Sequence, residues 1–209
     1  MKTASRHFFG IDLGTSSCSI AYATADPRHE DAQTIGVQTV EVPVDAEHAG
    51  QFTRRIPSYV SAPADAARGG AFFGALFAGP QKRKKAAPLL RRGRDFFSSV
   101  KSDLGTLKVY TRSRVPGCRT PADVTTVILD RLRGIARDRN AAHDLGNAPV
   151  VITVPASYSA LARTETLEAA VKAGFDRARV RLLDEPVAAL LDLLNGPEAA
   201  TPPRVELVD

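Results

Sequence analysis

Two short apolar runs separated by small polar residues open the chain. Residues 8–12 form an apolar run that ends in a carboxylate, Asp12, and an apolar-rich run covers residues 19–24. Runs of this length, bounded by turn-forming residues, predict strands. Gly14 lies in the turn between them, and a residue without a side chain lets the backbone approach a ligand closely. The pattern therefore predicts a strand, a tight turn and a second strand.

Strands and helices alternate in the C-terminal part of the sequence. The predicted elements are, in order, a buried strand at 150–154, a helix from about 159 to 172 stopped by Gly174, a strand at 179–183, and a helix opened by Pro186. This order implies a parallel βαβ unit. Ligands of such sheets usually sit beyond the carboxyl ends of the strands. Glu185 follows the second strand of the unit and is therefore in a suitable place for chemistry.

A further helix is predicted in the middle of the chain. Thr120, Pro121 and Asp123 form a helix start, with a cap, a proline at the first position and an acid in the first turn. A one-face apolar stripe follows, made of Val124, Ile128, Leu132 and Ile135. We interpret this stripe as part of the core, and residues 140–146 as a connector to the next strand.

The composition is that of a globular cytoplasmic protein. With 209 residues and 44% hydrophobic content, one compact lobe or two small subdomains are expected. No apolar run approaches the roughly 20 residues needed to span a bilayer, and the N-terminus lacks an apolar secretory core. The two cysteines have no metal-like spacing, and a buried reduced thiol is expected for Cys18. These features predict no membrane association.

Basic residues are concentrated in the runs 82–85 and 91–94, within a net charge of +5. Nucleic-acid binding is the more specific interpretation of such runs. However, no aromatic residues are interleaved with them and no binding module surrounds them. We therefore favour a solvated surface loop over residues 80–94, and we expect no nucleic-acid partner.

The turn after the first strand carries candidate phosphate-binding chemistry. Thr15, Ser16 and the exposed backbone amides can donate hydrogen bonds to phosphate oxygens. Asp12 is placed to hold a hydrated Mg²⁺ through its waters. The alternative is an ordinary hairpin with a small-residue turn. On this segment alone, the two interpretations have similar weight.

Four stretches together resemble the heat shock protein 70 (DnaK-type) chaperones of the actin-like ATPase superfamily. They are GIDLGTSS, FFSSVKSDLG, VVITVPASY with the trailing Arg163, and LLDEPVAALL. The resemblance implies an α/β fold: lobe I of an actin-like (ribonuclease H-like) ATPase, with a mixed sheet flanked by helices. Residues 1–45 and 118–209 would form a larger subdomain, and residues 46–117 a smaller inserted α/β subdomain that contains the basic loop.

The resemblance also implies a role for particular residues, with ATP and Mg²⁺ as cofactors. The phosphate-binding and metal-associated residues would be Asp12, Gly14, Thr15, Ser16 and Asp209. Lys101 would contact the transferring phosphate and position the attacking water. Glu185 would order the water shell of the metal, which Asp12, Glu185 and Asp209 would hold through water. Pro155 and Arg163 would form a switch that reports nucleotide state to a peptide-binding domain.

Each assignment has a simpler alternative. Lys101 could be a solvated lysine, and Glu185 could only complement a helix dipole. Pro155 could merely end a strand, and Arg163 could be an exposed helix arginine.

The sequence also departs from the family pattern. The family usually has threonine where Ser16 stands and asparagine where Asp184 stands, and Ser17 and Ser157 are further local changes. Asp184 adds a negative charge beside Glu185, and like charges so close raise a pKa. The effect of Asp184 on turnover is therefore open at this point.

The resemblance predicts the N-terminal half of a DnaK-like chaperone ATPase, in which ATP hydrolysis drives peptide binding and release. The chain ends in a strand-like run, residues 204–209, before a second phosphate loop and second lobe, so weak or absent activity is expected of the isolated chain. Expected partners are ATP or ADP, a J-domain co-chaperone, a nucleotide exchange factor and a separately encoded second lobe. Alternatives are a non-enzymatic interaction module, a sugar-kinase-like enzyme of the same superfamily, and a nonfunctional remnant.

Overall fold

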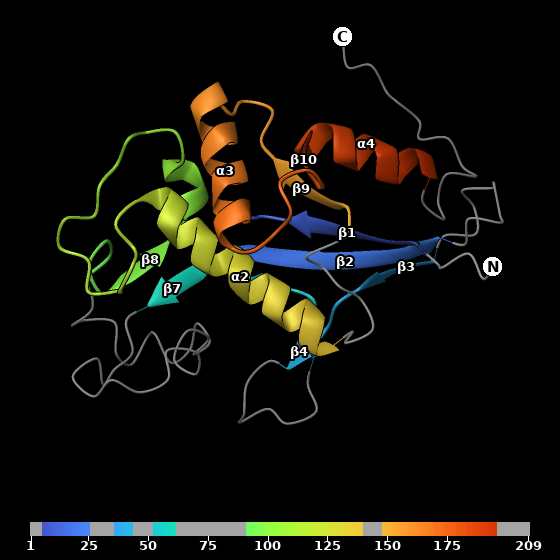
Figure 1. The fold of residues 1–209 in the computed structure, drawn as a ribbon, viewed down its shortest axis with the longest axis horizontal. Helices are drawn as coiled ribbons and strands as arrows, with labels where there is room; N and C mark the ends of the chain where they lie inside the picture. Colours follow the sequence, from blue (N-terminus) through green and yellow to red (C-terminus); the bar gives the residue numbers. More distant parts are fainter. Residues whose placement is uncertain (1–5, 26–35, 44–51, 62–90, 140–147, 196–209) are drawn as a thin grey trace, which may run out of the picture.

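A mixed β-sheet lies at the centre of the protein (Figure 1). The structure is a computed structural model that describes residues 6–25, 36–43, 52–61, 91–139 and 148–195. Five strands follow one another in the order β10-β9-β1-β2-β3: β10 (Val180–Asp184), β9 (Val150–Val154), β1 (Arg6–Asp12), β2 (Ser17–Ala25) and β3 (Gly36–Thr39). A short strand, β6 (Ile56–Pro57), pairs with the first residues of β2. The predicted mixed sheet is confirmed.

The two predicted strand units form as the sequence indicates. β1 and β2 are antiparallel and pair from Arg6–Ala25 to Asp12–Ser19, so the N-terminal segment is a hairpin. β9 is parallel to both β1 and β10, which confirms the βαβ unit. Both hairpin strands extend beyond the predicted bounds. β10 begins and ends one residue later than predicted, so Asp184 is its last residue.

Three helices of the described residues pack around this sheet: α2 (Pro121–Arg139), α3 (Ala160–Lys172) and α4 (Glu185–Asn195). At the start of α2, the Thr120 hydroxyl accepts from the Asp123 amide at 3.2 Å, and the Asp123 carboxylate accepts from the Thr120 amide at 2.9 Å. The Ser159 hydroxyl caps α3 by accepting from the Ala162 amide. The reciprocal bonds at α2 and the single bond at α3 satisfy backbone amides that have no partner inside the helix.

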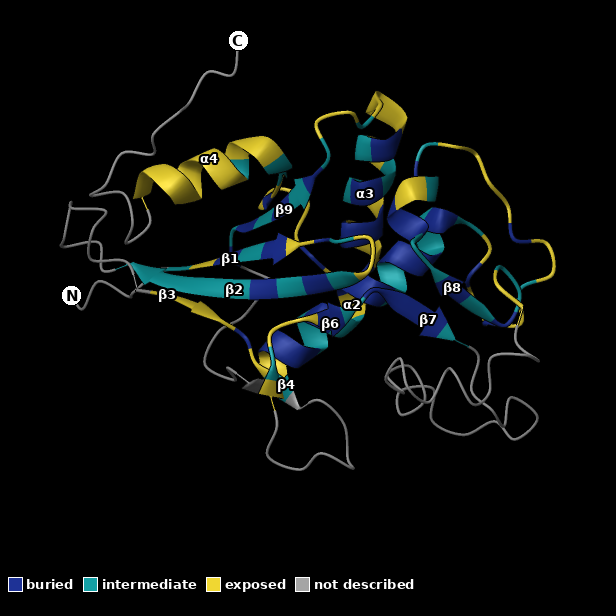
Figure 2. Ribbon diagram, turned by 180° about the vertical axis from the view of Figure 1, so that it is seen from behind, coloured by how far each residue is buried: buried dark blue, intermediate teal, exposed yellow. Residues whose placement is uncertain are grey.

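The stripe on α2 lies in the core, as predicted. Val124, Ile128, Leu132 and Ile135 are buried together with the sheet residues Ile11, Ile20 and Ile152. By contrast, α4 has no buried residue, and Figure 2 shows it exposed along most of its length. Its exposed apolar residues are Val187, Leu190, Leu191, Leu193 and Leu194. Among the described residues, no helix is both long enough and apolar enough to cross a membrane.

Shorter elements connect the sheet to α2. β4 (Val42–Pro43) pairs with β5 (Phe52–Thr53), and β7 (Tyr59–Ser61) pairs with β8 (Phe96–Ser98). A 3₁₀ helix, η3 (Val100–Asp103), follows β8 and carries Lys101. The division into residues 1–45 with 118–209 and residues 46–117 stays a prediction.

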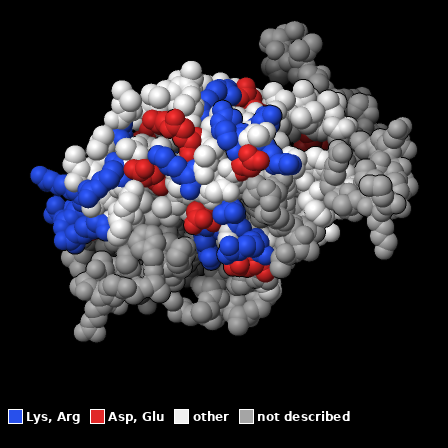
Figure 3. All heavy atoms as spheres, in the orientation of Figure 1, with Lys and Arg blue, Asp and Glu red and all other residues white. Residues whose placement is uncertain are grey.

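Several predicted segments lie wholly or mainly outside the described residues. They are most of the basic loop 80–94, the connector 140–146, and the C-terminal run 204–209 with Asp209. Of the second basic run, Arg91 and Arg92 are exposed, as expected of a solvated surface. Figure 3 shows that, over the centre of one face, Lys and Arg are interspersed with Asp and Glu.

Both cysteines are buried and reduced, which confirms the prediction for Cys18. Burial raises the pKa of the Cys118 thiol from 9.0 to about 12, and the nearby charge of Asp123 acts in the same direction. The unfolded chain therefore loses this proton at lower pH than the folded chain does. Stability is expected to fall as the pH rises from about 9 towards 12.

The same burial predicts slow thiol chemistry. At pH 8, iodoacetamide is expected to alkylate Cys118 slowly in the native chain and rapidly in urea, because the thiolate is the nucleophile and the native thiol is both protonated and covered. Mass spectrometry of alkylated peptides measures both rates. Equal rates in native buffer and in urea would contradict the burial of Cys118.

Candidate functional site

The candidate site lies at the edge of the sheet where three parallel strands end. Asp12 at the end of β1 is paired in register with Thr153 of β9, and Asp184 at the end of β10 is paired with Val154. The Thr153 hydroxyl donates to Asp12 Oδ1 at 3.0 Å, which fixes one carboxylate oxygen. Glu185, the first residue of α4, follows at the same edge. The sheet therefore brings both predicted carboxylates, Asp12 and Glu185, to one side.

The turn after β1 is tight and presents hydroxyl groups to solvent. Thr15 and Ser16 are exposed, whereas Leu13 is buried. A Cβ added at Gly14 would lie 2.0 Å from the backbone oxygen of Ser17, so only glycine fits this close approach. The hairpin interpretation is thus correct for the local structure. It is also compatible with phosphate binding, because the turn opens towards solvent at the edge that carries Glu185.

A buried thiol anchors the base of this turn. Cys18 Sγ shares a hydrogen bond of 3.0 Å with Ser58 Oγ and donates weakly to the Gly14 carbonyl at 3.9 Å. Burial raises the pKa of Cys18; the negative charge of Asp12 acts in the same direction, and the positive charge of Lys101 acts in the opposite one. The thiol at the base of the turn therefore stays protonated and neutral at ordinary pH.

Lys101 and Glu185 contact each other, although 84 residues separate them in sequence. Lys101 Nζ donates to Glu185 Oε1 in an ion pair. The lysine side chain is 8% exposed and the glutamate side chain is 41% exposed. The alternative of a solvated lysine is therefore wrong. The remaining exposure of Glu185 leaves the pair open to a ligand from one side.

The predicted switch residues lie next to this pair. Pro155 directly follows β9, and its carbonyl accepts from the Tyr158 amide at 3.1 Å. Arg163 on α3 donates through Nη2 to Asp184 Oδ1 at 2.6 Å and through Nε to the Tyr158 carbonyl at 3.3 Å. Arg163 is thus bonded to both the turn after β9 and the end of β10, unlike a freely solvated helix arginine.

Adjacent carboxylates at positions 184 and 185 each have their own cation. Asp184 pairs with Arg163, and Glu185 pairs with Lys101. The sequence raised the question of repulsion between these two groups but did not anticipate the Arg163–Asp184 pair. The only signal for that pair was the departure from asparagine at position 184.

Two contacts made by Tyr158 and Glu165 were not anticipated either. The Tyr158 hydroxyl donates to the Lys101 carbonyl at 2.7 Å, and Glu165 Oε2 accepts from the Gly105 amide at 2.7 Å. Both residues act on the segment that carries Lys101. Nothing in the sequence pattern marks these partners, because they lie 57 and 60 residues apart along the chain.

Metal binding by direct coordination is not evident in the described part of the chain, where no group of three or more His, Cys, Asp or Glu residues could hold an ion. The predicted set of Asp12, Glu185 and Asp209 would act through water, and Asp209 lies outside the described residues. This metal site stays a prediction.

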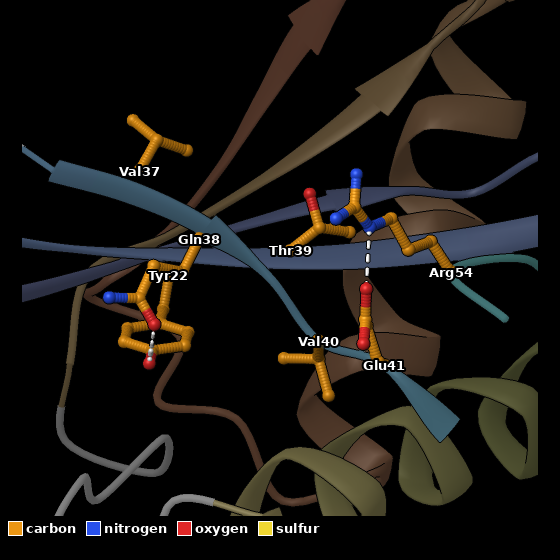
Figure 4. A pocket seen from close by; sticks show the side chains of 7 residues that line it. All are labelled: Tyr22, Val37, Gln38, Thr39, Val40, Glu41 and Arg54. Atoms are coloured by element: carbon orange, nitrogen blue, oxygen red, sulfur yellow. Dashed lines mark hydrogen bonds and ion pairs between the residues drawn. The ribbon is translucent and has the colours of Figure 1, made fainter. Parts of the chain in front are cut away.

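A separate open pocket of about 480 Å³ lies at the β3 edge of the sheet (Figure 4). Its lining residues are Tyr22, Val37, Gln38, Thr39, Val40, Glu41 and Arg54. Figure 4 shows an ion pair between Arg54 and Glu41 and a hydrogen bond between Tyr22 and Gln38. None of the predicted site residues lines this pocket, so it is distinct from the candidate site.

Comparison with known proteins identifies the relatives of the chain. The family described as Hsp70 protein matches residues 97–193, which include Lys101, Pro155, Arg163 and Glu185. The chain is 30% identical over 185 residues to the chaperone protein DnaK of Methanothermobacter thermautotrophicus, an alignment that covers 87% of this chain and 26% of the relative. It is 40% identical over 87 residues to a chaperone protein HscA homolog of Polynucleobacter necessarius, covering 42% of this chain and 13% of the relative.

The chain thus spans about a quarter of the length of the DnaK relative that it matches. The family match covers η3, α2, the βαβ unit and most of α4. The DnaK alignment extends the similarity over most of the chain. On these findings, the chain belongs to the Hsp70 family.

Proposed function

We propose that this chain supplies one side of the phosphate-binding site of a DnaK-like chaperone ATPase. In this proposal the described sheet and helices are lobe I of an actin-like, ribonuclease H-like fold. The observation that carries the proposal is the contact between Lys101 and Glu185 at the edge of the sheet where β1 ends in Asp12. A cation, two carboxylates and a hydroxyl-lined turn suit a hydrated metal and a polyphosphate.

The residues present fit Mg-ATP by their chemistry. The turn at Gly14 has no room for a side chain, and Thr15 and Ser16 supply exposed hydroxyl donors. When bound, ATP supplies the phosphoryl group and Mg²⁺ neutralises part of its charge. Lys101 would bind a phosphate oxygen in place of its present partner. Glu185 would then be free to accept a hydrogen bond from water and orient it, and Asp12 would hold metal-bound water.

This arrangement matches what phosphoryl transfer requires from a protein. The reaction depends on positioning and charge stabilisation more than on covalent chemistry. Because Lys101 is held in an ion pair, a phosphate must first displace Glu185. We therefore expect the 209-residue chain to bind ATP weakly and to turn it over slowly.

We also propose that the nucleotide state of this site is coupled to peptide binding. Pro155 and Arg163 would transmit nucleotide state, and the support for this is that Arg163 bonds both the turn after Pro155 and Asp184 beside Glu185. A peptide-binding domain, a second lobe, a J-domain co-chaperone, a nucleotide exchange factor and a cytoplasmic location belong to the same proposal.

A non-enzymatic interaction module is the second candidate function. One observation favours it: α4 has no buried residue and exposes five large apolar side chains. Exposed apolar surface of this kind is typical of sites that bind another protein.

Titration calorimetry with Mg-ATP, Mg-ADP and adenosine tests the primary proposal. The two nucleotides are expected to bind saturably, and adenosine is expected to bind at least tenfold more weakly because it offers no phosphate to Lys101 and the Gly14 turn. Equal affinity for adenosine and Mg-ATP would contradict a phosphate-centred site. An absence of any Mg-ATP binding at millimolar concentration would also contradict it.

A further inference from the structure

The segment that carries Lys101 is held against the N-terminal part of α3 by two hydrogen bonds. The Tyr158 hydroxyl donates to the Lys101 carbonyl at 2.7 Å, and the Glu165 carboxylate accepts from the Gly105 amide at 2.7 Å. Tyr158 lies in the turn just before α3, and Glu165 lies on α3 itself. The two bonds therefore fix η3 and Gly105 to α3 and to the turn just before it.

Close packing accompanies these bonds. Gly105 has a φ of +77°, and a Cβ added there would lie 2.9 Å from Ser159 Oγ and 3.0 Å from the Ala162 amide nitrogen. At the other end of the segment, Ser99 has a φ of 56°, in the left-handed region that residues with a side chain rarely adopt. A backbone in this conformation needs surrounding contacts to keep it there.

The Tyr158 hydroxyl stays a donor over the ordinary pH range. Burial raises the pKa of Tyr158 above its usual range, and the charges of Glu185 and Glu165 act in the same direction. The Tyr158 hydroxyl therefore keeps the proton that it donates to the Lys101 carbonyl.

We infer that Tyr158 and Glu165 are positioning residues that fix the Lys101 backbone so that its ammonium group meets Glu185 and, on binding, a phosphate. This inference rests on the proposed function for its phosphate part only. A lysine side chain is long and flexible, so the location of its ammonium group depends on a fixed backbone. A misplacement of about 1 Å in a phosphoryl-transfer site can cost roughly 100-fold in rate.

Trace acetylation of the full chain with acetic anhydride measures this positioning without any nucleotide. The ratio of acetylation at Lys101 to that at the exposed Lys172 is read by mass spectrometry. Tyr158→Phe and Glu165→Ala are expected to raise the ratio several-fold, because Lys101 becomes less tightly held in its buried pair. Glu165→Gln keeps an oxygen acceptor for the Gly105 amide and is expected to restore the wild-type ratio.

Tyr22→Phe is the matched control, because it removes a tyrosine hydroxyl bonded to Gln38 at the far edge of the sheet. It is expected to leave the ratio unchanged. Thermal unfolding of each variant checks that the fold is retained. An unchanged ratio in folded Tyr158→Phe would overturn the inference, whatever the result with ATP.

Single-turnover hydrolysis of Mg-ATP provides the second measurement. Tyr158→Phe is expected to lower the maximal rate about tenfold with little change in the ATP concentration for half-maximal rate, since it displaces Lys101 without removing a binding group. A rise in half-maximal concentration with no change in maximal rate would contradict positioning. Failure of the wild-type chain to bind ATP would overturn the proposed function, while the acetylation ratio would still decide whether Tyr158 positions Lys101.

Discussion

Replacing Lys101 with methionine is expected to weaken Mg-ATP binding about 10- to 100-fold while the fold is retained. A hydrogen bond to a charged group contributes roughly 1.5–3 kcal/mol, which corresponds to this loss of affinity. Methionine is about as long as the lysine stem and can fill the buried position, where only 8% of the side chain is exposed. Glu185 is 41% exposed, so its carboxylate keeps contact with water after its partner is removed.

Titration calorimetry and thermal unfolding together measure this effect. Lys172→Met is the matched control, because Lys172 is an exposed lysine in the last turn of α3, at the opposite end of the helix from Tyr158 and Ser159. It is expected to change neither affinity nor stability appreciably. If Lys101→Met binds Mg-ATP as tightly as the wild-type chain does, Lys101 is not a phosphate ligand.

Replacing Gly14 with alanine is expected to destabilise the chain by about 3 kcal/mol or more. The added Cβ would lie 2.0 Å from the Ser17 backbone oxygen. Because this neighbour is backbone and not the end of a flexible side chain, the hairpin itself must shift to make room. Overpacking typically costs roughly 1–3 kcal/mol, and a clash with backbone lies at the upper end or beyond. In a protein of this size, 3 kcal/mol lowers the unfolding temperature by roughly 6–12 °C.

Gly10→Ala is the matched control for this change. Gly10 lies on β1, the strand that leads into this turn, and a Cβ added there would meet no atom within 4 Å. Urea denaturation is expected to show a change of less than about 1 kcal/mol for Gly10→Ala. Equal losses for the two variants would mean that the turn at Gly14 is looser than the structure shows, and the case for a close-fitting phosphate turn would weaken.

Periodicity and turn chemistry were sufficient to predict the longer described elements, but not the short strands β3 to β8 or the 3₁₀ helix η3. The β1–β2 hairpin, β9, α3 and the stripe of α2 follow from local patterns of apolar spacing, capping and turn residues that are visible in a short stretch of sequence. The boundary between β10 and α4 differed by one residue. There the strand pattern and the helix signal of Pro186 overlap, and pairing of Asp184 with Val154 decides the strand end.

The site was only partly predictable, because its contacts are between residues distant in sequence. The joint placement of Lys101 and Glu185 was expected from the family resemblance, and no local pattern requires it. The Arg163–Asp184 pair and the contacts of Tyr158 and Glu165 depend on how α3 packs against η3 and β10, which propensity does not encode. The subdomain boundaries and the role of Asp209 stay predictions.

Backbone amide NMR of the full chain during a Mg-ATP titration tests the central claim most directly, namely that three distant segments converge on one polyphosphate. The account predicts saturable shifts with one common affinity in residues 12–17, around Lys101, and at Asp184 and Glu185. Shifts confined to the pocket lined by Tyr22, Gln38 and Arg54, with these three segments unchanged, would contradict it.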